Sequence, residues 1–156
     1  MSSGRIPELI TAALERLARL FRRQPGGPAH LRTGRKGEDM AYYFLRRQGY
    51  TIVARNWRCE GRKGEVDLIG WDGKILCFIE VKTRRSHAVA TAESAVDHAK
   101  QAELRGMAAR FLHRQSPRPQ SRFDVVSIYL IPGVDPEIEL FKDAFPWRTM
   151  GGKRRL

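Results

Sequence analysis

Hydrophobic residues recur with two different periods along the middle of the chain, and the change of period marks where helices give way to strands. A spacing of three to four residues predicts helices over 35–48 and 92–114. Short apolar runs bounded by turn-forming residues predict five strands, over 51–57, 64–71, 74–83, 122–131 and 137–145. The order α-β-β-β-α-β-β predicts an α/β fold, with a mixed central sheet flanked by helices.

The two ends of the chain differ in character from this middle. Residues 1–33 contain a basic amphipathic helix, "PELITAALERLARLFRR", followed by the linker "QPGGPAH". Residues 146–156 form a short, basic, glycine-containing tail. The pattern therefore places one domain over 34–145. The helix in 1–33 either packs on that domain, frays, or lies on a membrane surface or a partner, and the sequence leaves these alternatives open.

Composition narrows the class of protein. With 156 residues, the chain is long enough for one domain with a core of its own. The formal net charge of +12 favours a polyanionic partner, either nucleic acid or an anionic membrane surface. Cys59 and Cys77 form no Cys-x-x-Cys pair, and no apolar run reaches the roughly 20 residues that span a membrane. These features predict a cytoplasmic protein with no integral membrane association.

Charged residues interrupt the two strands predicted in "GEVDLIGWDGKILCFIEVKTRR", residues 64–85. The dipeptide Asp72-Gly73 predicts a two-residue hairpin loop, which would set Glu65 opposite Glu80. Because side chains alternate between the faces of a strand, four charged side chains then share one face, namely Glu65, Asp67, Glu80 and Lys82. The opposite face is apolar and is predicted to be the packed side of the sheet.

Like charges that face each other across two strands destabilise a sheet by about 0.2–1 kcal/mol. Three carboxylates on one face therefore indicate either a site for a hard divalent cation such as Mg²⁺, which prefers oxygen ligands, or a solvated surface neutralised by Lys82. Beside a cation, Lys82 would stabilise charge on a phosphate or orient an attacking water. The spacing alone favours neither interpretation.

The two halves of the hairpin carry a further pattern. "GEVDLI" followed by "FIEVKTR" resembles the D…ExK signature of the PD-(D/E)xK nuclease superfamily, with Val66 in place of the proline. The ordered series "GRKGEDMAYYFLRRQGYTIVARNWR", "GEVDLIG", "CFIEVKTR" and "RFDVVSI" resembles the YraN-type family of small bacterial proteins, which is related to archaeal Holliday-junction resolvases. The resemblance covers about residues 33–131 and implies a restriction-endonuclease-like core.

Carried over by position, the resemblance assigns roles to the charged face. Asp67 and Glu80 match metal ligands for Mg²⁺ or Mn²⁺, and Lys82 matches the catalytic lysine. Glu38 matches the acidic residue that completes the site in resolvase-like members; taken alone, it is typical of a carboxylate at the start of a helix. Glu65 belongs to the motif as a third candidate ligand.

Basic residues surround this face and predict contacts to a phosphate backbone that do not depend on base sequence. The candidates are Arg55, Arg58, Arg62, Lys63, Arg84 and Arg85, together with Lys100 and Gln101. Lys100 and Gln101 match a region where related nucleases place a polar residue near the site, but they also fit an ordinary solvated helix face. Trp57 and Trp71 are candidates for base stacking or, more simply, for packing in the core.

The sequence therefore predicts a metal-dependent nuclease or nuclease-like protein that hydrolyses DNA phosphodiesters, with branched or other non-duplex DNA as the favoured substrate. The alternative is a non-catalytic nucleic-acid-binding protein that keeps the fold and the charge. A third class is an adaptor that acts through the N-terminal helix. Resolvase-like relatives act as dimers on two-fold junctions, which makes a homodimer a reasonable assembly.

Overall fold

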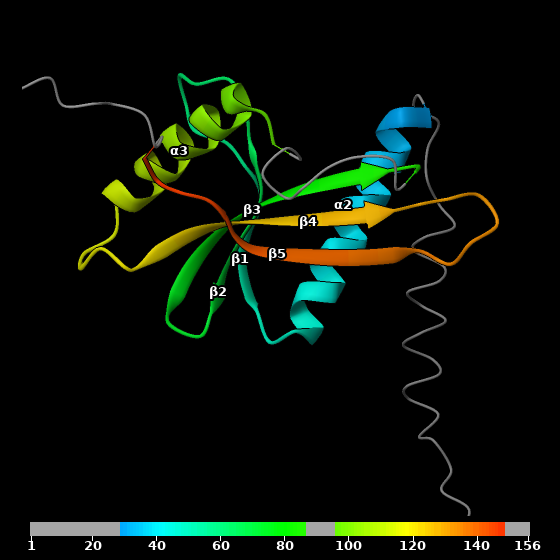
Figure 1. Ribbon diagram of the computed structural model, residues 1–156. Coiled ribbons are helices and arrows are strands. Elements are labelled where there is room, and N and C mark those ends of the chain that lie inside the picture. The colour runs from blue at the N-terminus through cyan, green and yellow to red at the C-terminus, as the bar shows by residue number, and fades with distance from the viewer. Residues whose placement is uncertain (1–28, 87–95, 149–156) are drawn as a thin grey trace, which may run out of the picture. The chain divides into compact units, whose positions relative to one another are not determined.

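The computed structural model describes residues 29–86 and 96–148, which form two helices and five strands (Figure 1). The helices are α2 (Ala29–Arg47) and α3 (His98–His113). The strands are β1 (Thr51–Trp57), β2 (Val66–Asp72), β3 (Ile75–Arg84), β4 (Ser121–Tyr129) and β5 (Glu137–Phe145). Contacts divide the chain into two units, Met1–Arg32 and Thr33–Leu156, and all five strands belong to the second. Within the described ranges, neither helix is long and apolar enough to cross a membrane.

The strands form one sheet in which the spatial order follows the chain order, β1-β2-β3-β4-β5. β3 and β4 are parallel, whereas each of the other neighbouring pairs is antiparallel. A parallel pair needs a crossover connection, and α3 lies in the connection between β3 and β4. The predicted mixed sheet flanked by helices, in the order α-β-β-β-α-β-β, is confirmed.

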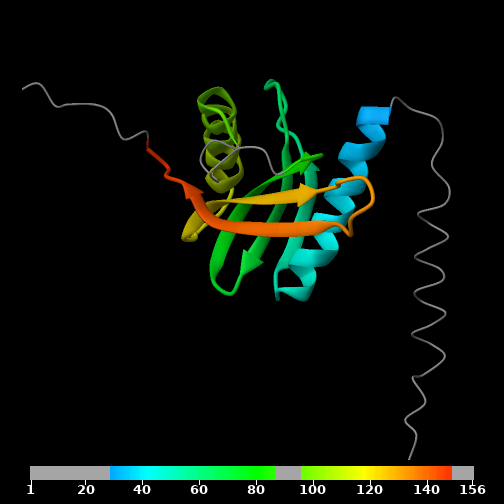
Figure 2. The same cartoon turned by 45° about the vertical axis from the view of Figure 1, so that its right-hand side comes forward.

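Two apolar clusters cover the two faces of the sheet. The cluster on the α3 face includes Phe78, Met107 and Phe123, and the cluster on the α2 face includes Leu45, Ile79 and Val126. In Figure 2 the strands accordingly run between α3 on one side and α2 on the other. Because β3 is covered on both faces, it is buried over its apolar first half, and its charged residues come only towards its C-terminal end.

The bounds of several elements differ from the predicted ones. α2 begins at Ala29, inside the stretch predicted as a linker, and continues through Gly34. α3 begins at His98 because the side chain of Asp97 caps it, accepting a hydrogen bond from the Lys100 amide at 2.8 Å. The helix predicted early in 1–33, residues 92–95 of the second predicted helix, and residues 149–156 of the tail lie outside the described residues.

The hairpin between β2 and β3 has a different register from the predicted one. Asp72 pairs with Ile75, so the loop is Gly73-Lys74 instead of Asp72-Gly73. Gly73 has the positive φ, 58°, that the first loop residue of a type II′ turn requires. Asp72 stays in the strand, where Arg122 of β4 pairs with it at 2.6 Å. Moving the loop by one residue shifts the cross-strand pairs by two, and a shift of two leaves every side chain on its predicted face.

A buried polar network lies on β4 and joins it to its surroundings. Asp124 is fully buried and accepts hydrogen bonds from the Tyr50 hydroxyl at 3.0 Å, from Arg122 Nε at 2.8 Å and from the Asp143 amide at 3.0 Å. Burial and the Asp124 charge raise the pKa of Tyr50, so this hydroxyl stays protonated and donates. The carboxylate at the centre of the network therefore has a full set of donors.

The same network extends to β2 and β5 through one more carboxylate. Arg122 also donates to Asp72 Oδ2, and Lys142 of β5 pairs with the same oxygen at 2.8 Å. Hydrogen bonds from Arg122 and Lys142 hold the pKa of Asp72 below its usual range. We refer to Asp124, Arg122, Tyr50, Asp72 and Lys142 as the β4 network; it ties three strands together with charges that are all paired.

Candidate active site

Asp67 and Glu80 come together just beyond the last pair of the β2–β3 ladder, Leu68–Ile79. Asp67 Oδ2 accepts a hydrogen bond from the Val81 amide at 2.7 Å, which fixes the carboxylate between the two strands. Both residues are buried, with 9% of Asp67 and 4% of Glu80 exposed. Burial, and then repulsion by the Glu80 charge, raise the pKa of Asp67 to about 7. Bringing the two carboxylates together therefore costs free energy in the metal-free protein.

Glu80 is a buried carboxylate with an incomplete set of hydrogen-bond donors. Its Oε1 pairs with Lys82 Nζ at 2.8 Å, whereas its Oε2 lies 3.5 Å from Lys100 Nζ, at the outer limit of an ion pair. Oε2 receives no hydrogen bond, and no other buried side-chain nitrogen or oxygen in residues 29–86 and 96–148 lacks one. Since nearly all buried polar atoms in proteins are hydrogen-bonded, this oxygen needs an explanation.

Lys100 brings a second ammonium group to the two carboxylates from α3. Its Nζ lies 2.8 Å from Glu103 Oε1, one helical turn along α3, and 3.3 Å from the Glu65 carbonyl oxygen. Burial by itself would lower the pKa of Lys100, but the hydrogen bond to Glu103 and the charge of Glu80 outweigh it, and the pKa is raised. Lys100 is therefore a cation held inside the site. We call Asp67, Glu80, Lys82 and Lys100 the site cluster.

Glu38 borders the site cluster from α2. The preceding residue, Gly37, packs so closely on Thr83 of β3 that any side chain there would overlap the threonine hydroxyl, and this approach brings α2 to the end of β3. Asn56, which has a left-handed backbone with φ 47°, donates a hydrogen bond to Glu38 Oε2 at 2.9 Å. The Glu38 charge contributes to the raised pKa of Asp67. The predicted acidic residue from the first helix thus lies within electrostatic range of Asp67.

The carboxylate of Glu65 does not join the cluster in the predicted way. In the observed register it is not opposite Glu80, and its Oε2 accepts hydrogen bonds from Arg58 at 2.7 and 2.9 Å. Over the described ranges, no three or more acidic, histidine or cysteine side chains gather in a group arranged to hold a metal ion. The carboxylates that come together at the site are therefore two, Asp67 and Glu80.

Two carboxylates suit one class of metal ion in particular. Mg²⁺ keeps several of its waters and is commonly bound through one or two carboxylates together with substrate phosphates. Asp67 and Glu80 Oε2, which has no hydrogen-bond donor, fit that donor set, because both present oxygen and neither belongs to a closed cage of protein ligands. A structural zinc site, with four nitrogen or sulfur ligands, does not fit them.

Several residues predicted to bind nucleic acid are engaged within the protein instead. Arg55 pairs with Asp39 of α2 and lies over the Tyr42 ring at 4.9 Å. Gln101 is buried: its amide donates to the Val96 carbonyl at 2.9 Å and accepts from Arg105 at 3.1 Å. Gln101 therefore holds the start of α3 in place and is not a surface contact.

The remaining basic candidates are on the surface or at its edge. Arg62, Lys63 and Arg85 are exposed, Arg58 is exposed but paired with Glu65, and Arg84 is half-buried. They lie in the β1–β2 connection and at the C-terminal end of β3, the two segments that border the site cluster. The exposed members of this set give that part of the surface a positive charge.

Sequence reasoning left the inner position of Lys100 open and missed the role of Asn56. The spacing of Lys100 and Glu103, three residues apart on a helix, is a signal for the first, because such residues share a helix face. Nothing in the local sequence marks Asn56, whose contact with Glu38 joins residues from different elements.

The chain is similar to known proteins over the whole of this region. Residues 37–128 match the model of the family described as "Uncharacterised protein family UPF0102". A UPF0102 protein of Koribacter versatilis is 52% identical over 122 residues, which cover 78% of this chain and 85% of that protein. A UPF0102 protein of Solibacter usitatus is 44% identical over 138 residues, covering 88% of this chain and 98% of the relative. A third, of Nocardia farcinica, is 46% identical over 113 residues.

Proposed function

The chain belongs to the UPF0102 family, the family that the YraN-type resemblance indicates, and from its site we propose that it is a metal-dependent nuclease that hydrolyses DNA phosphodiesters. The observation that carries the proposal is the buried Glu80 Oε2, which has no hydrogen-bond donor and lies beside a second buried carboxylate. A fold selected only for stability would pair or remove such a group. A divalent cation would occupy the lone pairs that the protein leaves free.

Each residue of the site cluster has a part in this proposal. Asp67 and Glu80 would hold Mg²⁺ or Mn²⁺, with Glu38 assisting directly or through water. When bound, the ion would supply positive charge that stabilises the phosphate as negative charge develops on it. Lys82, on the same face of β3 as Glu80, would orient the attacking water or the phosphate. Lys100, 3.5 Å from Glu80 Oε2, would add positive charge beside the bound phosphate.

The nucleic-acid part of the proposal rests on charge. The chain has a net charge of +12, and exposed basic residues border the site, including Lys63 and Arg85. Contacts of this kind neutralise phosphates without reading bases, so they suit a substrate recognised by shape. Branched or other non-duplex DNA is the substrate we propose, in keeping with the resolvase-like resemblance, and a homodimer is the assembly that would match a two-fold junction.

The cytoplasm is the compartment that fits this activity. Cys59 and Cys77 are both free thiols, and thiols persist in reducing compartments. Burial raises the pKa of Cys77 to about 12, which keeps that thiol protonated and inert within the core. We therefore propose a cytoplasmic location together with the DNA substrate.

One observation favours a second candidate function. Lys82 forms a 2.8 Å ion pair with Glu80, so the charges on this face are partly neutralised by the protein itself. A protein that binds nucleic acid through its basic surface, without cutting it, could keep such a face as a remnant of the fold. The two candidates differ in a single measurable step, cleavage in the presence of metal.

The test is cleavage of labelled junction, flap, single-stranded and duplex DNA with Mg²⁺ or Mn²⁺. We expect the wild-type protein to cut at least one non-duplex substrate, and Asp67→Asn and Lys82→Ala to lower the rate by at least about 100-fold while DNA binding persists. Asp72→Asn is the matched control, because it removes a strand carboxylate of the β4 network and should leave cleavage intact. Metal binding and DNA binding without cleavage of any substrate would reject the nuclease and leave the binding protein.

A further inference from the structure

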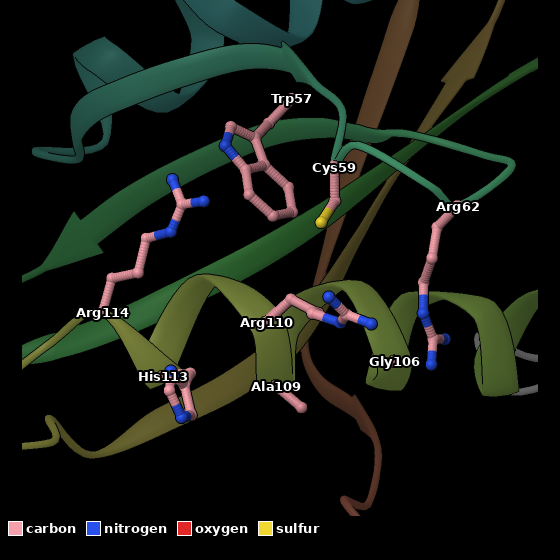
Figure 3. Close-up of a pocket in the computed structure, with 8 residues that line it drawn as sticks. All are labelled: Trp57, Cys59, Arg62, Gly106, Ala109, Arg110, His113 and Arg114. Atoms are coloured by element: carbon pink, nitrogen blue, oxygen red, sulfur yellow. The ribbon is translucent and has the colours of Figure 1, made fainter.

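A second site lies further along α3, between the helix and the connection that follows β1. A pocket of about 470 Å³ opens there, lined by Trp57, Cys59, Arg62, Arg110, His113 and Arg114 among others. None of these residues belongs to the site cluster. Figure 3 shows Trp57 pointing towards α3, with Arg114 on one side of it and Cys59 on the other in this view. The volume lies within the range of pockets that hold small organic ligands.

The charge around this pocket is unbalanced. Three arginines and one histidine line it, and within residues 29–86 and 96–148 none of the four forms an ion pair with a carboxylate. Other arginines of the same domain are used differently, since Arg58 pairs with Glu65 and Arg122 pairs with Asp72. The guanidinium groups around the pocket are therefore available to an anion from outside the protein.

Arg62 lies close to α3. Its guanidinium group lies over Gly106, in space that a side chain at this position would occupy. This contact brings Arg62 to the same pocket as Arg110, one helical turn further on. Arginine suits phosphate better than lysine does, because its planar fork of donors matches the phosphate oxygens.

The pocket also has an aromatic wall. Trp57 is half-buried, and its ring is fixed by an edge contact with Phe111, with the ring centres 5.3 Å apart and the planes at 84°. An aromatic ring held in place beside guanidinium groups provides both parts of what a nucleotide needs, a surface for the base and donors for the phosphate. A simple inorganic anion would use the arginines and leave the tryptophan without a role.

The position of the pocket relates it to the site cluster. Lys100 and Arg110 lie on one helix, ten residues apart. At a rise of about 1.5 Å per residue this is a separation of about 15 Å along the helix axis. Roughly four nucleotides at 3.4 Å per step cover that distance. A strand of a few nucleotides is therefore long enough to reach from one place to the other.

We propose that this pocket binds one unpaired nucleotide of the strand that the site cluster acts on, with its base on Trp57 and its phosphate between Arg62, Arg110 and Arg114. The inference rests on the proposed function, which identifies the strand as DNA. It adds a reason for the preference for non-duplex DNA, because a paired base cannot enter the pocket. A free mononucleotide has the same chemistry and is the alternative source of the ligand.

Binding of a ligand in the pocket can be measured through Cys59, without any reaction on DNA. It is half-buried and lines the pocket, whereas Cys77 is fully buried, so a neutral maleimide should modify Cys59 selectively. The rate of modification would be measured in EDTA at low, fixed ionic strength. The probes are a short oligothymidylate, thymidine monophosphate, a blunt duplex and inorganic phosphate. We expect the oligothymidylate to protect Cys59 at the lowest concentration, and the mononucleotide only at much higher concentration.

The matched variants remove equal charge from opposite faces of the sheet. Arg110→Ala with Arg114→Ala should weaken protection of Cys59 and binding of the oligothymidylate by about 10-fold, the value of one good stacking or phosphate contact. Arg46→Ala with Arg47→Ala, at the exposed end of α2, should change both by no more than about 3-fold. Equal losses in the two double variants would overturn the pocket as a binding site.

A second pair of variants tests the aromatic wall. Trp57→Leu should weaken binding of the oligothymidylate, and Trp57→Phe should restore most of it, with thermal unfolding used to confirm that both variants fold. If inorganic phosphate protects Cys59 as well as the oligothymidylate does, the proposal that the pocket binds a nucleotide is wrong. If the mononucleotide protects equally well, the proposal that the nucleotide belongs to a strand is wrong.

The result is separable from the proposed function, because the measurement contains no metal. Protection without cleavage in the metal-dependent assay would leave the pocket standing and reject the nuclease. Cleavage with no protection of Cys59 by any of the probes would reject the pocket and leave the nuclease.

Discussion

The site cluster and the β4 network are both built around two carboxylates on strands of the same sheet, but the fold treats them in opposite ways. In the β4 network, Asp124 accepts four hydrogen bonds, and Asp72 pairs with two cations. In the site cluster, an oxygen of Glu80 has no donor, and Asp67 has a pKa raised to about 7 by burial and by its neighbour. The same sheet thus contains one satisfied pair and one unsatisfied pair.

The two groups of carboxylates differ in the kind of cation that faces them. Arg122 satisfies two carboxylates at once because its planar group reaches both Asp72 and Asp124. The lysines of the site cluster are single-point donors, and Lys100 is shared with Glu103. Buried charge that is completely paired supports the fold, whereas buried charge left short of partners indicates a ligand. The following predictions test this contrast.

The largest effect is expected from breaking the satisfied pair. Asp124→Ala leaves the Tyr50 hydroxyl without its buried acceptor and takes from Arg122 one of its two carboxylate partners, which should lower the free energy of unfolding by about 3–5 kcal/mol. Glu80→Gln, in the site cluster, should change it by no more than about 1 kcal/mol. Urea unfolding of both variants in metal-free buffer measures the difference. A greater loss from Glu80→Gln than from Asp124→Ala would contradict the division between the two clusters.

Metal should act on one cluster only. Because Mg²⁺ or Mn²⁺ would bind the folded site and not the unfolded chain, it should stabilise the wild-type protein by about 2.7 kcal/mol at 100 times its dissociation constant. Asp67→Asn should remove this gain, and Asp72→Asn should keep it. Melting curves at constant ionic strength, with and without metal, check the outcome. A gain that survives in Asp67→Asn would place the metal elsewhere.

Without metal, removing charge from the site cluster should stabilise the protein. Asp67→Asn can still accept the hydrogen bond from the Val81 amide, but it no longer repels Glu80. We expect a gain of at least about 1 kcal/mol at pH 8, where Asp67 is ionised in the wild-type protein. A lower melting temperature for Asp67→Asn than for the wild type at pH 8 would show that Lys82 and Lys100 already balance the carboxylates.

The smallest effect is a difference in the sign of pH dependence. The folded-state pKa of Asp67, about 7, is above the ordinary value, so its contribution to stability is complete below about pH 4 and is lost as the pH rises through 7. The folded-state pKa of Asp72 is lowered, so its contribution is present above about pH 4 and is lost on acidification. In Asp67→Asn, the melting temperature should therefore no longer fall as the pH rises through 7. In Asp72→Asn, the melting temperature should fall less than in the wild type as the pH drops below about 4. If the melting temperatures of the wild type and the two variants change with pH in parallel, the opposite pKa shifts assigned to Asp67 and Asp72 are wrong.

The sequence predicted the elements and the faces of the sheet because both depend on local periodicity. Alternation along β3 placed Glu80 and Lys82 on one face, and this held although the predicted register was wrong by two residues. The register was wrong because Asp72 is held in its strand by Arg122, fifty residues further along the chain. A turn signal read from a dipeptide has no access to such a contact.

Partners within the candidate site were less predictable for the same reason. Local reasoning grouped Glu65 with Asp67 and Glu80, but the pairing of Glu65 with Arg58 depends on the path of the β1–β2 connection. It left Lys100 and Gln101 between a position near the site and a solvated helix face, whereas packing of α3 directs one into the site cluster and buries the other. Tertiary packing, and not periodicity, decides which charged side chains of a helix meet a sheet.

The consecutive order of β1, β2 and β3 has a consequence for how the chain folds. These three strands pair with sequence neighbours, whereas β3 and β4 meet only after the connection from Arg84 to Ser121 has closed. Local contacts form at a lower entropic cost, so the hairpin should assemble early. Asp67 and Glu80 belong to that hairpin, and their repulsion opposes an early step of folding. Asp67→Asn should therefore accelerate folding more than it slows unfolding, and the two arms of a denaturant chevron would record the difference.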